Sequence, residues 1–178
     1  MKLLDMTRKY GSATYGYPLE PYTVEDGFRG KPSYEYEKCI GCTACAVACP
    51  SNAISVQLNK KKDKLVWEFN CGRCIYCGRC DEVCPTNAVM LSKEFETAVK
   101  FNKDDLIERG ELELQKCDVC KKTFTTKRLV AYDLEKLRGV GWDEATIAEK
   151  TAYICTCQEC KKNIAVEKMN RYWGKAKK

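Results

Sequence analysis

The sequence contains no histidine among its 178 residues. Hydrolytic zinc sites, Ser-His-Asp and Cys-His nucleophile pairs and the two-histidine Rieske cluster all depend on imidazole, so this chain can build none of them. Any metal that it binds must be held mainly by thiolate, and the sequence offers fourteen cysteines for that purpose.

Long apolar runs are also missing, since no stretch approaches the roughly 20 residues that a membrane-spanning helix needs. The first residues, MKLLDMTRKYGS, hold one short apolar stretch followed by Arg8 and Lys9, with no small-residue cleavage site. We therefore expect a soluble, cytosolic chain with no direct membrane span. Thiols stay reduced in the cytosol, so clustered cysteines favour metal ligation over a disulfide framework.

The formal net charge of +6 leaves the metal sites out of the count. A 4Fe–4S core held by four thiolates carries about −2, and zinc held by four thiolates carries about −2 as well. Two such clusters and one such zinc bring the total to about zero. The basic balance is therefore weak support for nucleic-acid binding, and we expect no nucleic-acid partner.

The cysteine-rich part of the chain repeats at an offset of 35 residues. The stretch 39–50, CIGCTACAVACP, aligns without a gap with 74–85, CIYCGRCDEVCP. Each copy is the Cys-x2-Cys-x2-Cys-x3-Cys-Pro run of two-cluster bacterial ferredoxins, in which the fourth cysteine ligates the other cluster. A pair of structural zinc knuckles would explain neither the evenly spaced cysteines nor the paired prolines.

This crossed pattern predicts two sets of four ligands. The first 4Fe–4S cluster is expected on Cys39, Cys42, Cys45 and Cys84, and the second on Cys74, Cys77, Cys80 and Cys49. Two one-electron centres without a substrate-activating side chain form an electron wire, so we assign no catalytic residue. The isolated chain is expected to be no enzyme.

Cys71 falls outside the repeat, because the residue 35 positions before it is Tyr36. A buried free thiol is the favoured interpretation, since free cysteines often behave as small apolar residues. A spare ligand and a residue lying over the second cluster are the alternatives.

We expect an α+β fold in three parts. Residues 1–37 form an extended N-terminal arm, rich in glycine, proline and tyrosine, which either wraps its own domain or lies along a partner. Residues 38–92 form a bacterial ferredoxin-like core with two clusters. Its repeats end in strands at 53–58 and 88–91, and a polar tip at 59–64 returns through a strand at 65–69.

Residues 93–178 form a helical extension with a metal site. Helices are predicted near 103–109, capped by Asn102, at 126–137 and at 143–153, followed by a lysine-rich helical tail. Two Cys-x2-Cys knuckles lie 36 residues apart, and four thiolates around one tetrahedral ion would join them. We expect zinc, or iron in a rubredoxin-like site, on Cys117, Cys120, Cys157 and Cys160. Cys155 is left without a role.

Several segments together resemble one family. They are YPLEP at 17–21, GFRGKP at 27–32, the two cluster motifs, QKCDVC at 115–120 and TCQECK at 156–161. They are similar to the ferredoxin-type, two-cluster subunit of formate hydrogenlyase. That subunit belongs to the membrane-bound group 4 nickel–iron hydrogenase complexes. The two-cluster subunit of respiratory complex I is a more distant relative and usually lacks the cysteine-bearing tail.

The resemblance implies a function and a set of partners. Electrons from formate oxidation would arrive from another iron–sulfur subunit and pass through both clusters to a nickel–iron hydrogenase small subunit. The hydrogenase large subunit and the membrane-arm subunits would be further partners. The chain would then be cytoplasmic and peripheral on the inner membrane. The same wire in an NADH- or ferredoxin-quinone oxidoreductase, or in another energy-converting hydrogenase, is an alternative. A metal-stabilised module for binding nucleic acid or protein is another.

Overall fold

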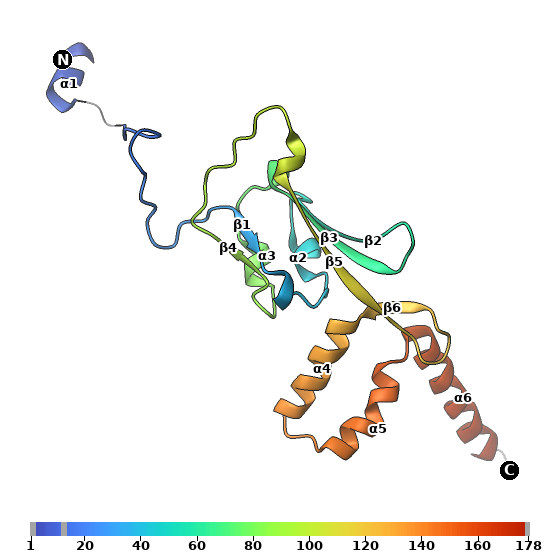
Figure 1. The fold of residues 1–178 in the computed structure, drawn as a ribbon. Helices are drawn as coiled ribbons and strands as arrows, with labels where there is room; N and C mark the ends of the chain where they lie inside the picture. The colour runs from blue at the N-terminus through green and yellow to red at the C-terminus, as the bar shows by residue number, and fades with distance from the viewer. Residues whose placement is uncertain (1–2, 12–13, 177–178) are drawn as a thin grey trace.

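The computed structural model describes residues 3–11 and 14–176, which form two small antiparallel sheets flanked by helices (Figure 1). This mixture of helices and strands agrees with the predicted α+β class. In the N-terminal segment, α1 (Leu3–Tyr10) lies apart from the sheets (Figure 1) and ends at Gly11, which has a φ of +66°. Residues 14–31 hold turns near 17–19 and 26–27 and no helix or strand, and they lead to β1 (Pro32–Tyr34), followed by the short 3-10 helix η1 (Tyr36–Lys38).

The smaller sheet joins the N-terminal segment to the end of the second repeat. In it, β1 pairs antiparallel with β4 (Val89–Leu91), with Tyr34 opposite Val89. The predicted strand at 88–91 is confirmed as β4. Strand β1 lies inside the segment 1–37, so part of the predicted arm is a strand of the folded core.

The larger sheet has the order β2-β3-β5-β6. Strands β2 (Ile54–Leu58) and β3 (Lys64–Asn70) form the predicted hairpin, in which Leu58 lies opposite Leu65. The Asn59 side chain closes the tip by accepting hydrogen bonds from the backbone N–H groups of Asp63 and Lys64. Strands β5 (Ile107–Lys116) and β6 (Thr123–Thr126) extend this sheet with residues from the region after 92.

The prediction of a helix near 103–109 is wrong for its second half. Only the 3-10 helix η3 (Lys103–Leu106) forms, and the side chain of Asn102 caps it by accepting from the N–H of Asp104 at 3.1 Å. Residues 107–109 begin β5 instead, because Gly110, Leu112 and Leu114 point into the core while Glu111 and Glu113 stay exposed. Such alternation suits a half-buried strand.

The core is built around the aromatic residues of β3. Trp67 and Phe69 are 2% and 1% exposed, and they pack with Ile54 and Val89. The ring of Tyr34 stacks on Trp67, with centroids 3.8 Å apart and an interplanar angle of 10°. The same tyrosine covers Gly110, where an added Cβ would lie 2.7 Å from its ring. A glycine at this position therefore makes room for the stacked pair.

The 35-residue repeat is visible in the backbone and extends beyond the cysteine motifs. Left-handed φ angles recur in pairs at that offset: +74° at Gly41 and +55° at Tyr76, +65° at Thr43 and +80° at Gly78, and +51° at Asn52 and +52° at Asn87. Each motif holds one short helix, α2 (Ala44–Ala48) or α3 (Arg79–Glu82). The 3-10 helix η2 (Cys71–Arg73) precedes the second motif, as η1 precedes the first.

The C-terminal helices begin and end close to the predicted residues. They are α4 (Lys127–Gly139), α5 (Glu144–Ile154) and α6 (Gln158–Ala176). Thr126 caps α4 by accepting from the N–H of Leu129 at 3.1 Å, and Asp143 caps α5 by accepting from that of Thr146 at 3.0 Å. Within the described ranges, none of the helices combines the length and apolar character that crossing a bilayer requires.

The C-terminal extension packs on the first cysteine loop and leaves Ile75 of the second loop exposed. The Thr126 hydroxyl donates a hydrogen bond to the carbonyl of Ile40. Arg128 donates to the carbonyl of Cys39 at 3.3 Å. As a result Ile40 is 8% exposed, whereas Ile75, its counterpart in the repeat, is 61% exposed.

Candidate iron–sulfur and metal sites

The first cavity is lined by four cysteines from both repeats: Cys39, Cys42, Cys45 and Cys84. Three of them come from the loop and the start of α2, and Cys84 comes from the turn after α3. Trp67, Val89 and Leu112 supply apolar walls. The sequence places Cys84 far from the other three, and the fold brings it to them.

The second cavity is the counterpart of the first and is lined by Cys49, Cys74, Cys77 and Cys80. Its apolar walls include Pro32, Ile54 and Phe69. The structure therefore groups the eight thiols in the two sets that the crossed pattern predicts. That these thiols ligate clusters stays a prediction.

The fourth cysteine of each motif receives matched hydrogen bonds. The N–H of Ala53 donates to Cys49 Sγ at 3.2 Å, and that of Ala88 donates to Cys84 Sγ at 3.1 Å. Burial acts to raise the pKa of both thiols, but backbone N–H groups and a neighbouring hydroxyl outweigh it, so that each pKa lies below its usual value. Both sulfur atoms are thus prepared to carry negative charge.

Cys45 and Cys80 lie deeper and behave in the opposite way. Burial raises the pKa of Cys45, and it raises that of Cys80 to about 11 with help from the nearby sulfurs of Cys74 and Cys45. Thiols in this setting ionise when a cation comes to them. Four sulfurs around an apolar cavity, with N–H groups directed at sulfur, are a donor set that fits a 4Fe–4S cluster.

Cys71 belongs to the core and not to either set of four. It is 4% exposed and packs with the residues around Phe69. Its sulfur lies 3.3 Å from the hydroxyl of Tyr76. In the described part of the chain, the lining of the second cavity does not include it.

A third cysteine group lies in the C-terminal extension. The sulfurs of Cys117, Cys120, Cys157 and Cys160 all lie within 4.8 Å of one another. The first knuckle is the turn between β5 and β6, and the second opens α6. The knuckles are joined by a hydrogen bond from the N–H of Cys157 to Cys117 Sγ at 3.2 Å. The predicted four residues are thus brought together, and their ligation of a metal stays a prediction.

The charges of these four thiols are strongly coupled. Burial acts to raise the pKa of Cys117, but the backbone N–H groups of Cys157, Cys120 and Val119 outweigh it and lower this pKa to about 6. Hydrogen bonding to Cys157, followed by burial, raises the pKa of Cys160 to about 12. Four adjacent thiols cannot all ionise without a cation among them. One tetrahedral metal ion supplies that charge, and the donor set fits zinc or iron.

Cys155 stands beside this group without joining it. Its carbonyl accepts a hydrogen bond from the N–H of Asp118 at 3.1 Å, which ties the second knuckle to the first. Its thiol is not among the four clustered sulfurs.

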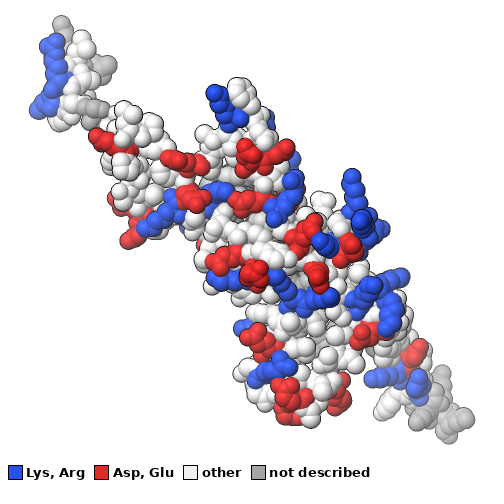
Figure 2. All heavy atoms as spheres, viewed as in Figure 1, with Lys and Arg blue, Asp and Glu red and all other residues white. Residues whose placement is uncertain are grey.

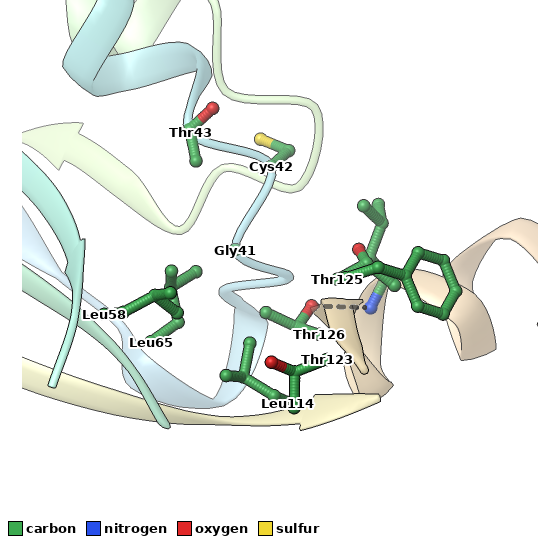
Figure 3. A pocket seen from close by; sticks show the side chains of 11 residues that line it. Gly41, Cys42, Thr43, Leu58, Leu65, Leu114, Thr123, Thr125 and Thr126 are labelled. Carbon is green, nitrogen blue, oxygen red and sulfur yellow. Dashed lines mark hydrogen bonds between the residues drawn. The ribbon is translucent and has the colours of Figure 1, made fainter. Parts of the chain in front are cut away.

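A groove of about 310 Å³ opens where the first cysteine loop meets the extension (Figure 3). Gly41, Cys42 and Thr43 lie on one side of it, and Leu58 and Leu65 of the hairpin form a second wall. The third wall comes from the extension and includes Leu114, Thr123, Thr125 and Thr126. Cys42 also lines the first cavity, so the groove reaches one of the predicted ligands of the first cluster.

Sequence reasoning missed three side chains beside the first cavity. Thr126 was recognised only as the start of a helix, and its hydrogen bond to Ile40 depends on strands that were not predicted. Tyr34 and Trp67 gave no signal, because an aromatic residue in an alternating strand indicates a core position and nothing more.

The charged side chains are mixed over the surface seen in Figure 2. Acidic and basic residues alternate across the sheet, where they form ion pairs such as Lys64–Glu111 at 2.6 Å and Arg109–Glu68 at 2.7 Å. A nucleic-acid-binding surface is instead expected to gather basic residues on one face. The viewed face does not have that character (Figure 2).

Comparisons with known proteins agree with this geometry. Residues 38–88 match the family model described as "4Fe-4S dicluster domain". The chain is 46% identical over 154 residues to formate hydrogenlyase subunit 6 of Escherichia coli, covering 86% of this chain and 84% of that protein. It is 35% identical over 127 residues to NADH-quinone oxidoreductase subunit I 1 of Koribacter versatilis, covering 64% of this chain and 84% of that protein.

A solved structure of the archaeal membrane-bound sulfane sulfur reductase also matches. It shares 25% identity and a TM-score of 0.43 over 57% of this chain and 56% of that one. A superposition of this extent supports no argument about function.

Proposed function

Because this chain belongs to the family of formate hydrogenlyase subunit 6, to which NADH-quinone oxidoreductase subunit I is related, we propose that it is the electron relay of a formate hydrogenlyase-type complex. It is an iron–sulfur electron-transfer subunit of a multi-subunit oxidoreductase. The proposal adds the route: from an iron–sulfur subunit on the formate dehydrogenase side, through two 4Fe–4S clusters, to a nickel–iron hydrogenase small subunit.

The observation that carries this proposal is the pair of four-cysteine cavities. In each, three thiols come from one motif and the fourth from the other. Each 4Fe–4S cluster, when bound, takes up and gives up one electron. Cys39, Cys42, Cys45 and Cys84 would hold the first, and Cys74, Cys77, Cys80 and Cys49 would hold the second.

The protein's own residues place the two sites and stabilise the charge on their sulfurs. The eight thiols line two neighbouring cavities, since Cys45 of the first and Cys80 of the second pack in the same core. The N–H groups of Ala53 and Ala88 stabilise charge on the fourth sulfurs. Apolar walls such as Ile54 and Val89 keep water away from both sites. Two such sites would serve to pass electrons, because each 4Fe–4S cluster exchanges one electron at a time.

The same family relationship supports the wider assignment of partners and place. We infer contacts with an iron–sulfur donor subunit, with the hydrogenase large and small subunits and with membrane-arm subunits. The chain would then lie on the cytoplasmic face of the inner membrane, held there by its partners. The four clustered cysteines of the extension would hold one zinc ion, or one iron ion, in a structural role.

Anaerobic purification of the complex tests the proposal. We expect about eight iron and eight sulfide per chain and, after reduction, a spin signal from two interacting clusters. The copurifying subunits should include a nickel–iron hydrogenase and a formate dehydrogenase. Fewer than about four iron per chain would contradict the relay itself.

The relationship to NADH-quinone oxidoreductase subunit I favours a second candidate, the equivalent relay in a quinone-reducing complex or another energy-converting hydrogenase. This candidate ranks second, because the match to formate hydrogenlyase subunit 6 is longer and has the higher sequence identity. Copurification of quinone-reductase subunits without a formate dehydrogenase would reverse this order.

A further inference from the structure

The strands beside the two cavities follow the same repeat as the cysteines. Tyr34 lies opposite Val89 in the smaller sheet, and Phe69, 35 residues after Tyr34, lies opposite Ile54 in the larger one. Pro32 and Trp67 are related in the same way, facing Leu91 and Val56. Each residue beside one cavity can therefore be compared with its counterpart beside the other.

The two repeats supply matching polar contacts to the fourth cysteine of each motif, Cys49 and Cys84. Besides the N–H groups of Ala53 and Ala88, the hydroxyls of Ser51 and Thr86 lie 3.7 and 3.8 Å from the sulfurs of Cys49 and Cys84. These contacts favour negative charge on the fourth sulfur of both sites.

At the strand positions the halves differ. Pro32 and Phe69 flank the second cavity, and neither side chain has a hydrogen-bond donor. Their counterparts beside the first cavity are Trp67, with an indole N–H, and Tyr34, with a phenol O–H. Trp67 itself lines the first cavity, and Tyr34 is stacked on it.

Both of these donors are buried without a hydrogen-bond acceptor. Over residues 3–11 and 14–176, Tyr34 Oη and Trp67 Nε1 are the buried side-chain nitrogen or oxygen atoms that lack a partner of ordinary hydrogen-bond geometry. A buried donor without an acceptor costs free energy, and folded proteins rarely contain one. That both unpaired donors stand beside the same four thiols points to a ligand at that site.

The first cavity supplies the candidate acceptors, which are the sulfurs of its four cysteines. Trp67 lines the first cavity together with Cys39, Cys42 and Cys45. Tyr34 is placed beside this wall because its ring stacks on Trp67 and packs against the same core. Gly110 leaves room for the tyrosine, since an added Cβ there would lie 2.9 Å from its hydroxyl oxygen.

We propose that Trp67 and Tyr34 donate hydrogen bonds to sulfurs at the first cysteine site and thereby raise the reduction potential of the first cluster alone. This inference rests on the proposed cluster assignment. Reduction adds negative charge to the cluster and its sulfurs, and a donor directed at sulfur stabilises the reduced form. The second cluster lacks both donors, so two sites with the same ligand spacing are given different affinities for an electron.

The test is a potentiometric titration, followed by electron spin resonance, of the intact complex carrying Tyr34→Phe or Trp67→Phe. Tyr34→Phe removes only the hydroxyl. In each variant we expect the midpoint potential of one cluster to fall and that of the other to stay. A tenfold change in electron affinity corresponds to about 59 mV for one electron. The signal lost in a Cys42→Ala variant identifies the first cluster.

Tyr76→Phe is the matched control. Its hydroxyl lies 3.3 Å from the sulfur of Cys71, which is not a predicted ligand, so its loss should leave the first cluster's potential unchanged. An independent readout is the exchangeable proton coupled to the reduced first cluster, which should disappear in heavy water and weaken in Tyr34→Phe.

The possible results separate this inference from the proposed function. A wild-type chain without two clusters overturns both. If both clusters are present and the two variants leave both potentials unchanged, only the hydrogen-bond inference is overturned. Equal shifts of both clusters would also overturn it, because they would indicate a general loosening of the core. If Trp67→Phe fails to fold, Tyr34→Phe decides alone.

Discussion

The hydroxyl of Thr126 makes two hydrogen bonds that join the C-terminal extension to the first cysteine loop. It donates to the carbonyl of Ile40 and accepts from the N–H of Leu129, and the residue is 1% exposed. One side chain thus caps α4 and fixes the loop that carries Cys39 and Cys42. Figure 3 shows Thr126 close to Gly41, on the wall of the groove.

Replacing Thr126 with valine should destabilise the chain by about 1–3 kcal/mol, because a buried carbonyl and a helix N–H both lose their partner. Denaturant unfolding of the metal-loaded chain measures this loss. The first cluster should also be lost faster in air. Asp143→Ala removes the cap of α5 without touching the cysteine loop. An equal rate of cluster loss in the two variants would show that Thr126 is only a helix cap.

The grouping of the thiols predicts which cluster each fourth cysteine serves. Cys84→Ala should remove about four of the roughly eight iron atoms and disturb the same spectral signal as Cys42→Ala. Cys49→Ala should remove a similar amount of iron and disturb the signal that Cys77→Ala disturbs. The reverse assignment of these signals would mean that each motif binds its cluster with its own four cysteines.

Cys71→Ser should keep both clusters, because the Cys71 side chain lies in the core and outside the two groups of four. We expect full iron content and a loss of stability of roughly 1 kcal/mol from placing a hydroxyl at a buried thiol position. Iron analysis together with thermal unfolding measures both quantities. Loss of the second cluster's signal in this variant would make Cys71 a ligand and the predicted motif register wrong.

The site in the extension should release one metal ion when Cys160 is replaced by serine, while the iron–sulfur spectrum stays. Metal analysis of the purified chain checks this, with Cys155→Ser as the control that retains the ion. A concurrent loss of cluster signal would indicate that the extension holds an iron–sulfur cluster.

The same site predicts how the metal-free extension responds to pH. The pKa of Cys117 is lowered to about 6, so its contribution to stability is complete above the ordinary thiol pKa of about 9 and disappears as pH falls toward 6. The pKa of Cys160 is raised to about 12, so this residue withdraws stability as pH rises from about 9. After treatment with a chelator, the free energy of unfolding should fall both toward about pH 6 and above about pH 9. In Cys117→Ser the fall toward about pH 6 should be absent.

The cysteine groups could be predicted from the sequence because their spacing is set by local geometry. A cluster loop and a metal knuckle both need two residues between successive cysteines, so both patterns can be recognised without knowing the fold. The starts of the helices at 126–137 and 143–153 were predicted to within one residue, since a helix start depends mainly on the residues of its first turn.

Strand β5 escaped prediction although its pattern was present. The run Gly-Glu-Leu-Glu-Leu at 110–114 alternates as a half-buried strand does, but its charged residues and the cap at Asn102 favoured a helix. Residues 107–116 form a strand because they pair with the open edge of β3. The local sequence of these residues carries no sign of a pairing partner that lies about 40 residues away. The roles of Tyr34 and Trp67 were hidden likewise, because a donor's acceptor is known only when the strands are in register.

The difference between Ile40 and Ile75 has a consequence for the whole molecule. A duplicated domain by itself would present two equivalent ends, and a neighbour could attach to either. By covering Ile40 and leaving Ile75 exposed, the extension makes the two ends of the duplicated domain different. The first and second cysteine loops therefore present different surfaces, and each surface can recognise a different neighbouring protein.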